Sequence, residues 1–179
     1  MRKTVRKLFW MWEFEKEEAW LNEMAAKGLA LISVGFCRYE FEDCTPGEYT
    51  FRLQLLENTV PHPESQKYLA FLEETGVEHI GSWLRWVYLR KKTADGGFEL
   101  FSDNESRIRH LSLVISLLLL LGIANLICGI NNVMLFFINR ISFSLIGIVN
   151  LVIGISCCIG VRRLIVKRRK LKNEQQLFE

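Results

Sequence analysis

Four glutamates stand close together near the start of the chain, a grouping of carboxylates that general acid–base catalysis could use. They are Glu13, Glu15, Glu17 and Glu18. Acidic residues are also favoured in the first turn of a helix, because the positive end of the helix dipole lies there. A helix is predicted from residue 15 onward, and we therefore interpret the cluster as a helix terminus rather than as a catalytic pair.

The sequence contains no motif for metal binding, nucleotide binding or nucleophilic catalysis. The three histidines have no ligand spacing with one another or with the five cysteines. Cys37 and Cys44 are close enough along the chain to bridge a hairpin, although reduced thiols are expected in a cytoplasmic domain. Neither a glycine-rich phosphate loop nor a nucleophile elbow is present. The sequence therefore predicts no metal, no cofactor and no enzymatic activity.

Two uncharged segments, residues 111–130 and 141–161, predict a pair of transmembrane helices. Each has the ~20 residues that a helix needs to cross ~30 Å of hydrocarbon. Residues 1–110 carry 15 Lys/Arg against 18 Asp/Glu, whereas residues 162–179 carry seven Lys/Arg against two Glu. Arg107, Arg109 and His110 directly before the first segment, and the basic residues after the second, predict a multi-pass protein of the cell membrane with both termini in the cytoplasm and a short outer loop. The basic tail, 162–179, is expected to contact anionic lipid rather than nucleic acid.

Polar and small residues inside the predicted spans are candidates for helix packing. Asn125 and Asn150 lie at similar predicted depths, and an unpaired amide in hydrocarbon is costly, so we expect them to face each other or a partner protein. Four glycines form smooth stripes that allow close helix contact: Gly122, Gly129, Gly147 and Gly154. The alternatives are simple hairpin packing and assembly with another membrane protein. A transport pathway is not expected, because the spans contain no acidic residue.

Residues 1–102 predict a cytoplasmic α+β domain, followed by the membrane part 103–161 and the tail. The expected elements are strands at 5–12, 29–42, 49–55, 77–91 and 98–101, and helices at 15–27 and 64–75. The order β-α-β-β-α-β with one extra short strand predicts a ferredoxin-like fold, an antiparallel sheet with two helices on one face. A change of alternation near Gly35 predicts a bulge. A capping box at 102–105 predicts one helix that continues from about 103 to 130.

Arginine and tryptophan side chains predict a candidate binding face on this sheet. The candidate residues are Arg38, Arg52, Arg85, Trp83 and Trp86. The face would bind a peptide, a partner strand or an anionic ligand. The alternative is a solvated face with ion pairs, such as Arg38 or Arg52 with Glu40. RNA fits this face poorly and no nucleic-acid partner is expected, because the domain is net acidic and lacks the aromatic-basic RNP pattern.

The chain resembles the bacterial domain-of-unknown-function family 2812. The resemblance rests on segments from residue 14 to residue 106: Phe14-Glu-x-Glu17-Glu-x-Trp20-Leu-x-x-Met24-Ala-x-x-Gly28, Tyr39-x-Phe41, Pro46-Gly-Glu-Tyr49, Trp86-x-Tyr88-x-Arg90 and Phe101-Ser-Asp-Asn-Glu-Ser106. Members of this family commonly carry C-terminal membrane spans and are often encoded beside PadR-like transcription regulators. The resemblance implies a regulator-linked membrane protein and supplies no catalytic residues.

Our first hypothesis is a non-enzymatic regulatory or adaptor protein, whose cytoplasmic domain binds a protein partner or a ligand. The alternatives are an accessory subunit of a membrane transporter and a small-molecule sensor.

Overall fold

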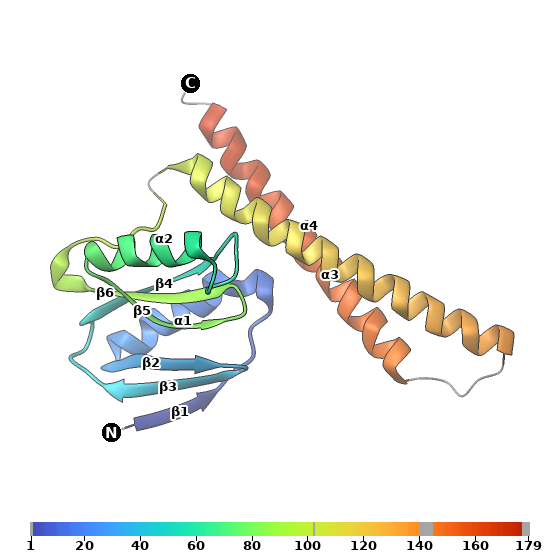
Figure 1. The fold of residues 1–179 in the computed structure, drawn as a ribbon, viewed down its shortest axis with the longest axis horizontal. Coiled ribbons are helices and arrows are strands. Elements are labelled where there is room, and N and C mark those ends of the chain that lie inside the picture. The colour runs from blue at the N-terminus through green and yellow to red at the C-terminus, as the bar shows by residue number, and fades with distance from the viewer. Residues whose placement is uncertain (1, 102, 140–144, 177–179) are drawn as a thin grey trace. The chain divides into compact units, whose positions relative to one another are not determined.

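The computed structural model describes residues 2–101, 103–139 and 145–176. The chain divides into two compact units, Met1–Ser102 and Asp103–Glu179, which we call the N-terminal and C-terminal units. The N-terminal unit contains strands and helices, and the C-terminal unit is a pair of long helices (Figure 1).

The N-terminal unit is built from two β-α-β-β repeats of the same design. The first repeat contains β1 (Arg2–Arg6), α1 (Phe14–Ala26), β2 (Leu29–Gly35) and β3 (Arg38–Asp43), with a short 3-10 turn, η1 (Met11–Glu13), before α1. The second contains β4 (Tyr49–Leu55), α2 (Pro63–Glu74), β5 (Val77–Trp83) and β6 (Trp86–Lys92), followed by η2 (Thr93–Asp95). Each repeat forms an antiparallel three-stranded sheet in which its last strand lies in the middle, in the orders β1-β3-β2 and β4-β6-β5.

This architecture confirms the α+β class but not the ferredoxin-like order. The two segments predicted as long strands, 29–42 and 77–91, are each a hairpin closed by two residues. The change of alternation near Gly35 marks the first of these turns, and the register irregularities lie earlier, at Ile32 and Ile80. The chain therefore has six strands in two sheets.

Two further predictions about strands were wrong. The first strand is β1, and the chain from residue 7 to residue 10 is irregular rather than part of a strand over 5–12. Residues 98–101 form no strand, because Phe98 inserts as a single side chain into a buried cluster under α2. Its burial is achieved by packing rather than by pairing with a neighbouring strand.

The two repeats share a sequence signal at the end of their helices. In each helix a large aromatic residue and a leucine are followed, at the same spacing, by an apolar residue and a glycine. In the first repeat these residues are Trp20, Leu21, Met24 and Gly28, and in the second they are Tyr68, Leu69, Leu72 and Gly76. Both glycines adopt the left-handed backbone, with φ of 80° and 81°. Glycine is the preferred residue for ending a helix in this conformation.

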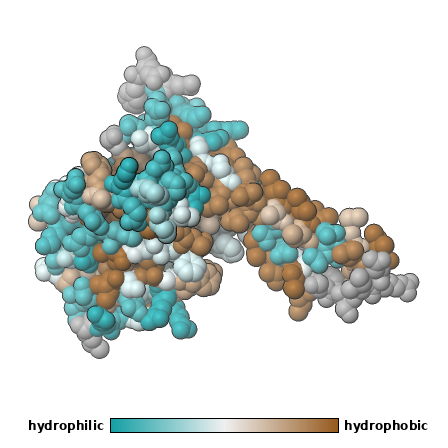
Figure 2. Space-filling model, in the orientation of Figure 1, coloured by the Kyte–Doolittle hydropathy of each residue, from teal (hydrophilic) through white to brown (hydrophobic). Residues whose placement is uncertain are grey.

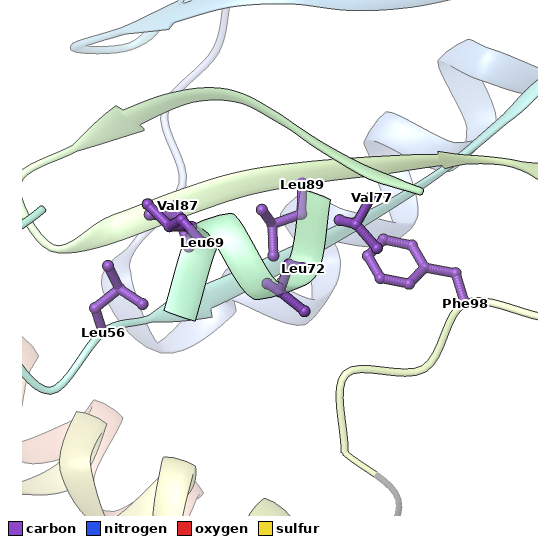
Figure 3. Close-up of a cluster of buried hydrophobic side chains, with 7 residues drawn as sticks. All are labelled: Leu56, Leu69, Leu72, Val77, Val87, Leu89 and Phe98. Carbon is purple, nitrogen blue, oxygen red and sulfur yellow. The ribbon is translucent and has the colours of Figure 1, made fainter. Parts of the chain in front are cut away.

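Strand β6 is buried on both faces and separates two parts of the core. Val87 and Leu89 point to one face, where they join a cluster with residues of α2 (Figure 3). The members of this cluster are Leu56, Leu69, Leu72, Val77, Val87, Leu89 and Phe98. Trp86 and Tyr88 alternate to the opposite face, which is turned toward α1. Full burial of each large apolar side chain contributes about 1.5–3 kcal/mol.

Helix α1 lies between the two sheets (Figure 1). On one side Trp20 meets the rings of Tyr39 and Phe41 edge-on, with centroid distances of 5.0 and 5.7 Å. The sheets approach each other along β2 and β5, where the absence of a side chain at Gly81 leaves room for Val34. Helix α1 thus belongs to the first repeat and also contacts the second.

Polar side chains of α1 form hydrogen bonds with backbone groups along the outer edge of β4. Asn22 Oδ1 accepts a hydrogen bond from the backbone N–H of Phe51 at 2.8 Å, and Asn22 Nδ2 donates to the Phe51 carbonyl at 3.0 Å. The N–H of Leu53 donates to Glu18 Oε2 at 3.0 Å. Because an edge strand leaves backbone groups without partners, these side chains take the place of a neighbouring strand.

The C-terminal unit consists of α3 (Asn104–Asn139) and α4 (Leu145–Gln176), which pack along each other. Both helices are long and apolar enough to cross a membrane. Brown, apolar residues cover most of the visible surface of the helix pair in Figure 2. Helix α3 continues through residues 131–139, which the sequence assigned to the outer loop, and Arg140 lies outside the described residues.

Asp103 begins α3 as an N-cap, since its Oδ1 accepts a hydrogen bond from the N–H of Ser106 at 2.7 Å. The predicted capping box relied on Ser102, which lies outside the described residues.

Replacing Asn22 by Ala is expected to lower the free energy of unfolding of the N-terminal unit by about 1–3 kcal/mol, because both backbone groups of Phe51 lose their partner. All five tryptophans lie in this unit, so tryptophan fluorescence during urea titration of the detergent-solubilised chain reports its unfolding. Asn58→Ala is the control, because Asn58 makes an exposed hydrogen bond to Glu64 and should cost less than about 0.5 kcal/mol. Equal effects of the two changes would contradict the role assigned to Asn22.

Candidate functional site

A cavity of about 200 Å³ lies in the N-terminal unit, where the segment before α1 meets the turns of both hairpins. Eight of its lining residues are aromatic. Phe36 and Trp83, from the two hairpins, contact each other with ring centroids 5.5 Å apart. Phe14 of α1 packs on Trp86 at 5.3 Å. Both repeats therefore contribute walls to the same cavity.

The carboxylate of Glu17 lies within this aromatic lining. Glu17 occupies the buried stripe of α1, three residues after Phe14 and four before Leu21, and only 8% of it is exposed. Its Oε1 accepts hydrogen bonds from the hydroxyls of Tyr39 at 2.7 Å and Tyr88 at 2.6 Å. One tyrosine stands on β3 and the other on β6, so a single oxygen atom joins the two sheets.

Burial sets the protonation of this group. It raises the pKa of Glu17, and the hydrogen bonds from Tyr88 and Tyr39 lower the pKa by less. Burial likewise raises the pKa of both tyrosine hydroxyls, which remain protonated donors at neutral pH. Across the described residues, no basic side chain forms an ion pair with Glu17. Among the described side chains, the ionised form of Glu17 is therefore stabilised by two hydroxyl donors and by no cation.

Lys7, which lines the cavity, lies over the faces of two aromatic rings, of which Phe9 also lines the cavity. Lys7 is exposed, and its Nζ lies 4.7 Å from the ring centroid of Phe9 and 4.5 Å from that of Trp20. These distances are those of cation–π contacts.

The rim of the cavity exposes most of the large apolar side chains on the surface of the N-terminal unit. Among its described residues six such side chains are exposed, and five of them line the cavity: Leu8, Trp10, Phe36, Trp83 and Leu84. Apolar residues gathered around a concave site are typical of binding surfaces.

Both hairpin turns hold a strained residue at this rim. Cys37 has φ of 53° and Leu84 has φ of 56°, and both line the cavity. They are the two non-glycine residues with positive φ in the described part of the chain. The left-handed conformation costs such residues about 1–2 kcal/mol, and it is typical of functional sites.

The three arginines of the predicted binding face lie outside this cavity. Arg38 forms an ion pair with Glu40 on its own strand. Arg52 pairs with Glu18, with Nη1 3.2 Å from Oε1. Arg85 donates to the backbone carbonyls that follow β4, at 2.8 Å from Nε and 2.5 Å from Nη2 to the first of them. Each arginine thus has a partner within the fold.

The two tryptophans of that face do reach the cavity. Trp83 ends β5 and Trp86 begins β6, and the two are paired across the hairpin. Trp83 is partly exposed and Trp86 is buried.

The four glycines predicted for helix packing all lie where α3 meets α4. A Cβ at Gly129 would come within 2.7 Å of Leu151, and one at Gly154 within 2.7 Å of Leu126. A Cβ at Gly122 would lie 3.0 Å from Cys157, and one at Gly147 would lie 2.9 Å from the Asn132 side chain. The close contact of these helices therefore depends on glycine at each position.

Asn125 and Asn150 do not face each other, and the alternative that they face a partner protein stays a prediction. Asn125 Nδ2 donates to the carbonyl of Leu121, one turn earlier in its own helix, at 2.8 Å. The contacts of the helix pair set Asn150 near the level of Gly129, more than a turn (~5.4 Å) from Asn125.

The family model for a protein of unknown function, DUF2812, matches residues 13–123 of the chain. The chain belongs to this family. No curated protein and no solved structure matches it.

The DUF2812 match includes Glu17, Tyr39 and Tyr88, and it begins after Lys7, Phe9 and the other cavity residues that precede α1.

Sequence reasoning about this DUF2812 protein missed the buried carboxylate of the cavity, because Glu17 stands among other acids at a helix start. Its position in the buried stripe of α1, between Phe14 and Leu21, was the available signal. A carboxylate at a core position needs a buried donor, and Tyr39 and Tyr88 stand at inward positions of their strands.

The stability of the DUF2812 protein is expected to depend on the titration of Glu17. Because the folded state raises this pKa above the ordinary value of 4.5, the native protein binds more protons than the unfolded chain between the two values. The free energy of unfolding therefore falls as pH rises through that window.

Glu17→Gln should remove this part of the pH dependence of stability, because glutamine does not titrate. Its amide oxygen can still accept hydrogen bonds from both tyrosine hydroxyls. The measurement is urea unfolding of both proteins from pH 4 to 8, followed by tryptophan fluorescence. The free energy of unfolding of Glu17→Gln, relative to that of the unmodified protein, should increase as pH rises. A difference that does not change with pH would contradict the assignment.

Proposed function

We propose that this chain is a non-enzymatic regulatory protein, anchored in a membrane by α3 and α4, whose N-terminal unit binds a small ligand in the aromatic cavity. The observation that carries the proposal is the cavity between the two repeats, with a buried carboxylate in its wall and an apolar rim.

Several features of the cavity favour binding over catalysis. Its ionisable groups are a carboxylate that accepts two tyrosine hydroxyls, an exposed lysine and one cysteine. Burial raises the pKa of both tyrosines, so neither hydroxyl is an activated nucleophile. The cavity is small and mainly aromatic, which suits recognition of a compact ligand.

The membrane part of the proposal rests on the C-terminal unit. Both of its helices have the length and apolar composition of membrane spans. The basic residues after 161 favour a cytoplasmic location for both termini, which would place the N-terminal unit in the cytoplasm. The glycines that would suit assembly with another membrane protein are already used between α3 and α4, so the transporter-subunit alternative has less support.

The proposal predicts saturable binding of small ligands at one site. Ligand-observed NMR on the full chain in nanodiscs, with a library of neutral and charged aromatic compounds, should give binders that compete with one another. Trp83→Ala should weaken them at least about tenfold, because it removes one wall of the cavity.

Phe71→Ala is the matched control. Phe71 is also an exposed aromatic residue, 59% exposed, and lies outside the cavity. Absence of saturable binding, or equal loss in both variants, would overturn the proposed function.

A further inference from the structure

We infer that the ligand of this cavity is a small organic cation of the alkylated or quaternary ammonium class. The inference rests on the proposed function and adds the chemical class of the ligand.

The first observation is that the carboxylate of Glu17 has no positively charged partner among the described residues. Glu17 Oε1 accepts two hydrogen bonds, and no residue in the described part of the chain donates to Oε2. Buried carboxylates are ordinarily paired with a positive group, because an isolated charge is costly to remove from water. Lys7 lines the same cavity without forming an ion pair with Glu17. A cation that entered the cavity would supply the missing charge.

The second observation is the aromatic lining. The faces of aromatic rings attract cations, and cages of such rings recognise quaternary ammonium groups. Lys7 shows this attraction within the chain itself, since its ammonium lies over the rings of Phe9 and Trp20. The cavity therefore combines the two features, a negative charge and π faces, that an organic cation uses.

Other ligand classes fit these groups less well. An anion would be repelled by Glu17, and a neutral apolar molecule would leave the carboxylate without a positively charged partner. A metal ion needs several oxygen, nitrogen or sulfur ligands, and no such group of residues occurs among those that the structure describes. An ammonium ion that carries alkyl groups gives up little hydration, because its surface is largely apolar, and a volume of about 200 Å³ limits it to a compact headgroup.

The same chemistry occurs in a free cation and in the headgroup of a choline lipid. The experiment therefore uses the full chain in nanodiscs made only of phosphatidylglycerol, which carries no ammonium group. Isothermal calorimetry compares choline with 3,3-dimethylbutan-1-ol, its neutral counterpart of nearly equal shape. Choline is expected to bind at least about tenfold more tightly.

Glu17→Gln is expected to abolish this preference, so that choline and the alcohol bind with similar affinity. Its fluorescence-detected urea transition shows whether it is folded. Lys7→Met provides a second variant at an exposed position. It should strengthen choline binding about threefold, because it removes a like charge from the cavity lining and frees the face of Phe9.

The inference is overturned if the alcohol binds as tightly as choline, if the preference survives in folded Glu17→Gln, or if Lys7→Met weakens choline binding. If neutral ligands bind and choline does not, the inference is wrong, but the proposed function is still supported. Nanodiscs of phosphatidylcholine distinguish the sources, since free choline would no longer bind if the lipid headgroup already occupied the cavity.

Discussion

The carboxylate of Glu17 accepts one hydrogen bond from each of the two sheets, and this contact constrains how the sheets sit on either side of α1. Tyr39 belongs to the first repeat and Tyr88 to the second, while α1, which carries Glu17, lies between them. Burying a carboxylate is costly, and two hydroxyl donors offset the cost only if both sheets are held at hydrogen-bond distance. The contact therefore favours specific positions of the sheets, which apolar packing alone would specify less strictly.

Other polar residues along α1 also connect the first repeat to the second. Near its start Glu17 lies beside the cavity, and one residue later Glu18 accepts the N–H of Leu53. A further turn along, Asn22 holds both backbone groups of Phe51. The polar residues of one helix face thus replace a strand partner for β4, and the apolar stripe of the same helix forms core. A ligand in the cavity would contact both repeats, so its binding energy would add to that of the contacts that already join them.

The sequence predicted correctly those strands and helices that a local pattern of apolar and polar residues defines. Strand β4 was predicted with its observed bounds, and α1 and α2 begin and end within one residue of their predicted ranges. The hairpin turns were missed because Cys37 and Leu84 adopt positive φ without the Asn-Gly or Gly-rich signals that normally mark such turns. With the turns hidden, two hairpins resembled two long strands, and the repeat of one β-α-β-β design was not recognised.

The site was less predictable than the fold for a physical reason. Trp83 and Trp86 were predicted as binding residues because, three positions apart, they cannot lie on the same face of one regular strand. The carboxylate was not, since a glutamate in the first turns of a helix has a sufficient local explanation in the helix dipole. Only the tertiary arrangement, which brings Tyr39 and Tyr88 from separate sheets to one oxygen atom, distinguishes Glu17 from its acidic neighbours.

The pKa of Glu17 is the most direct test of this arrangement. Carbon-13 NMR of the full chain in maltoside micelles, labelled at the glutamate carboxyl carbons, would follow its titration, with the signal assigned by its loss in Glu17→Gln. A pKa above the ordinary glutamate value of 4.5, which falls when choline is added, is the expected result. A pKa at or below 4.5 that choline leaves unchanged would contradict both the burial of this carboxylate and its role in the cavity.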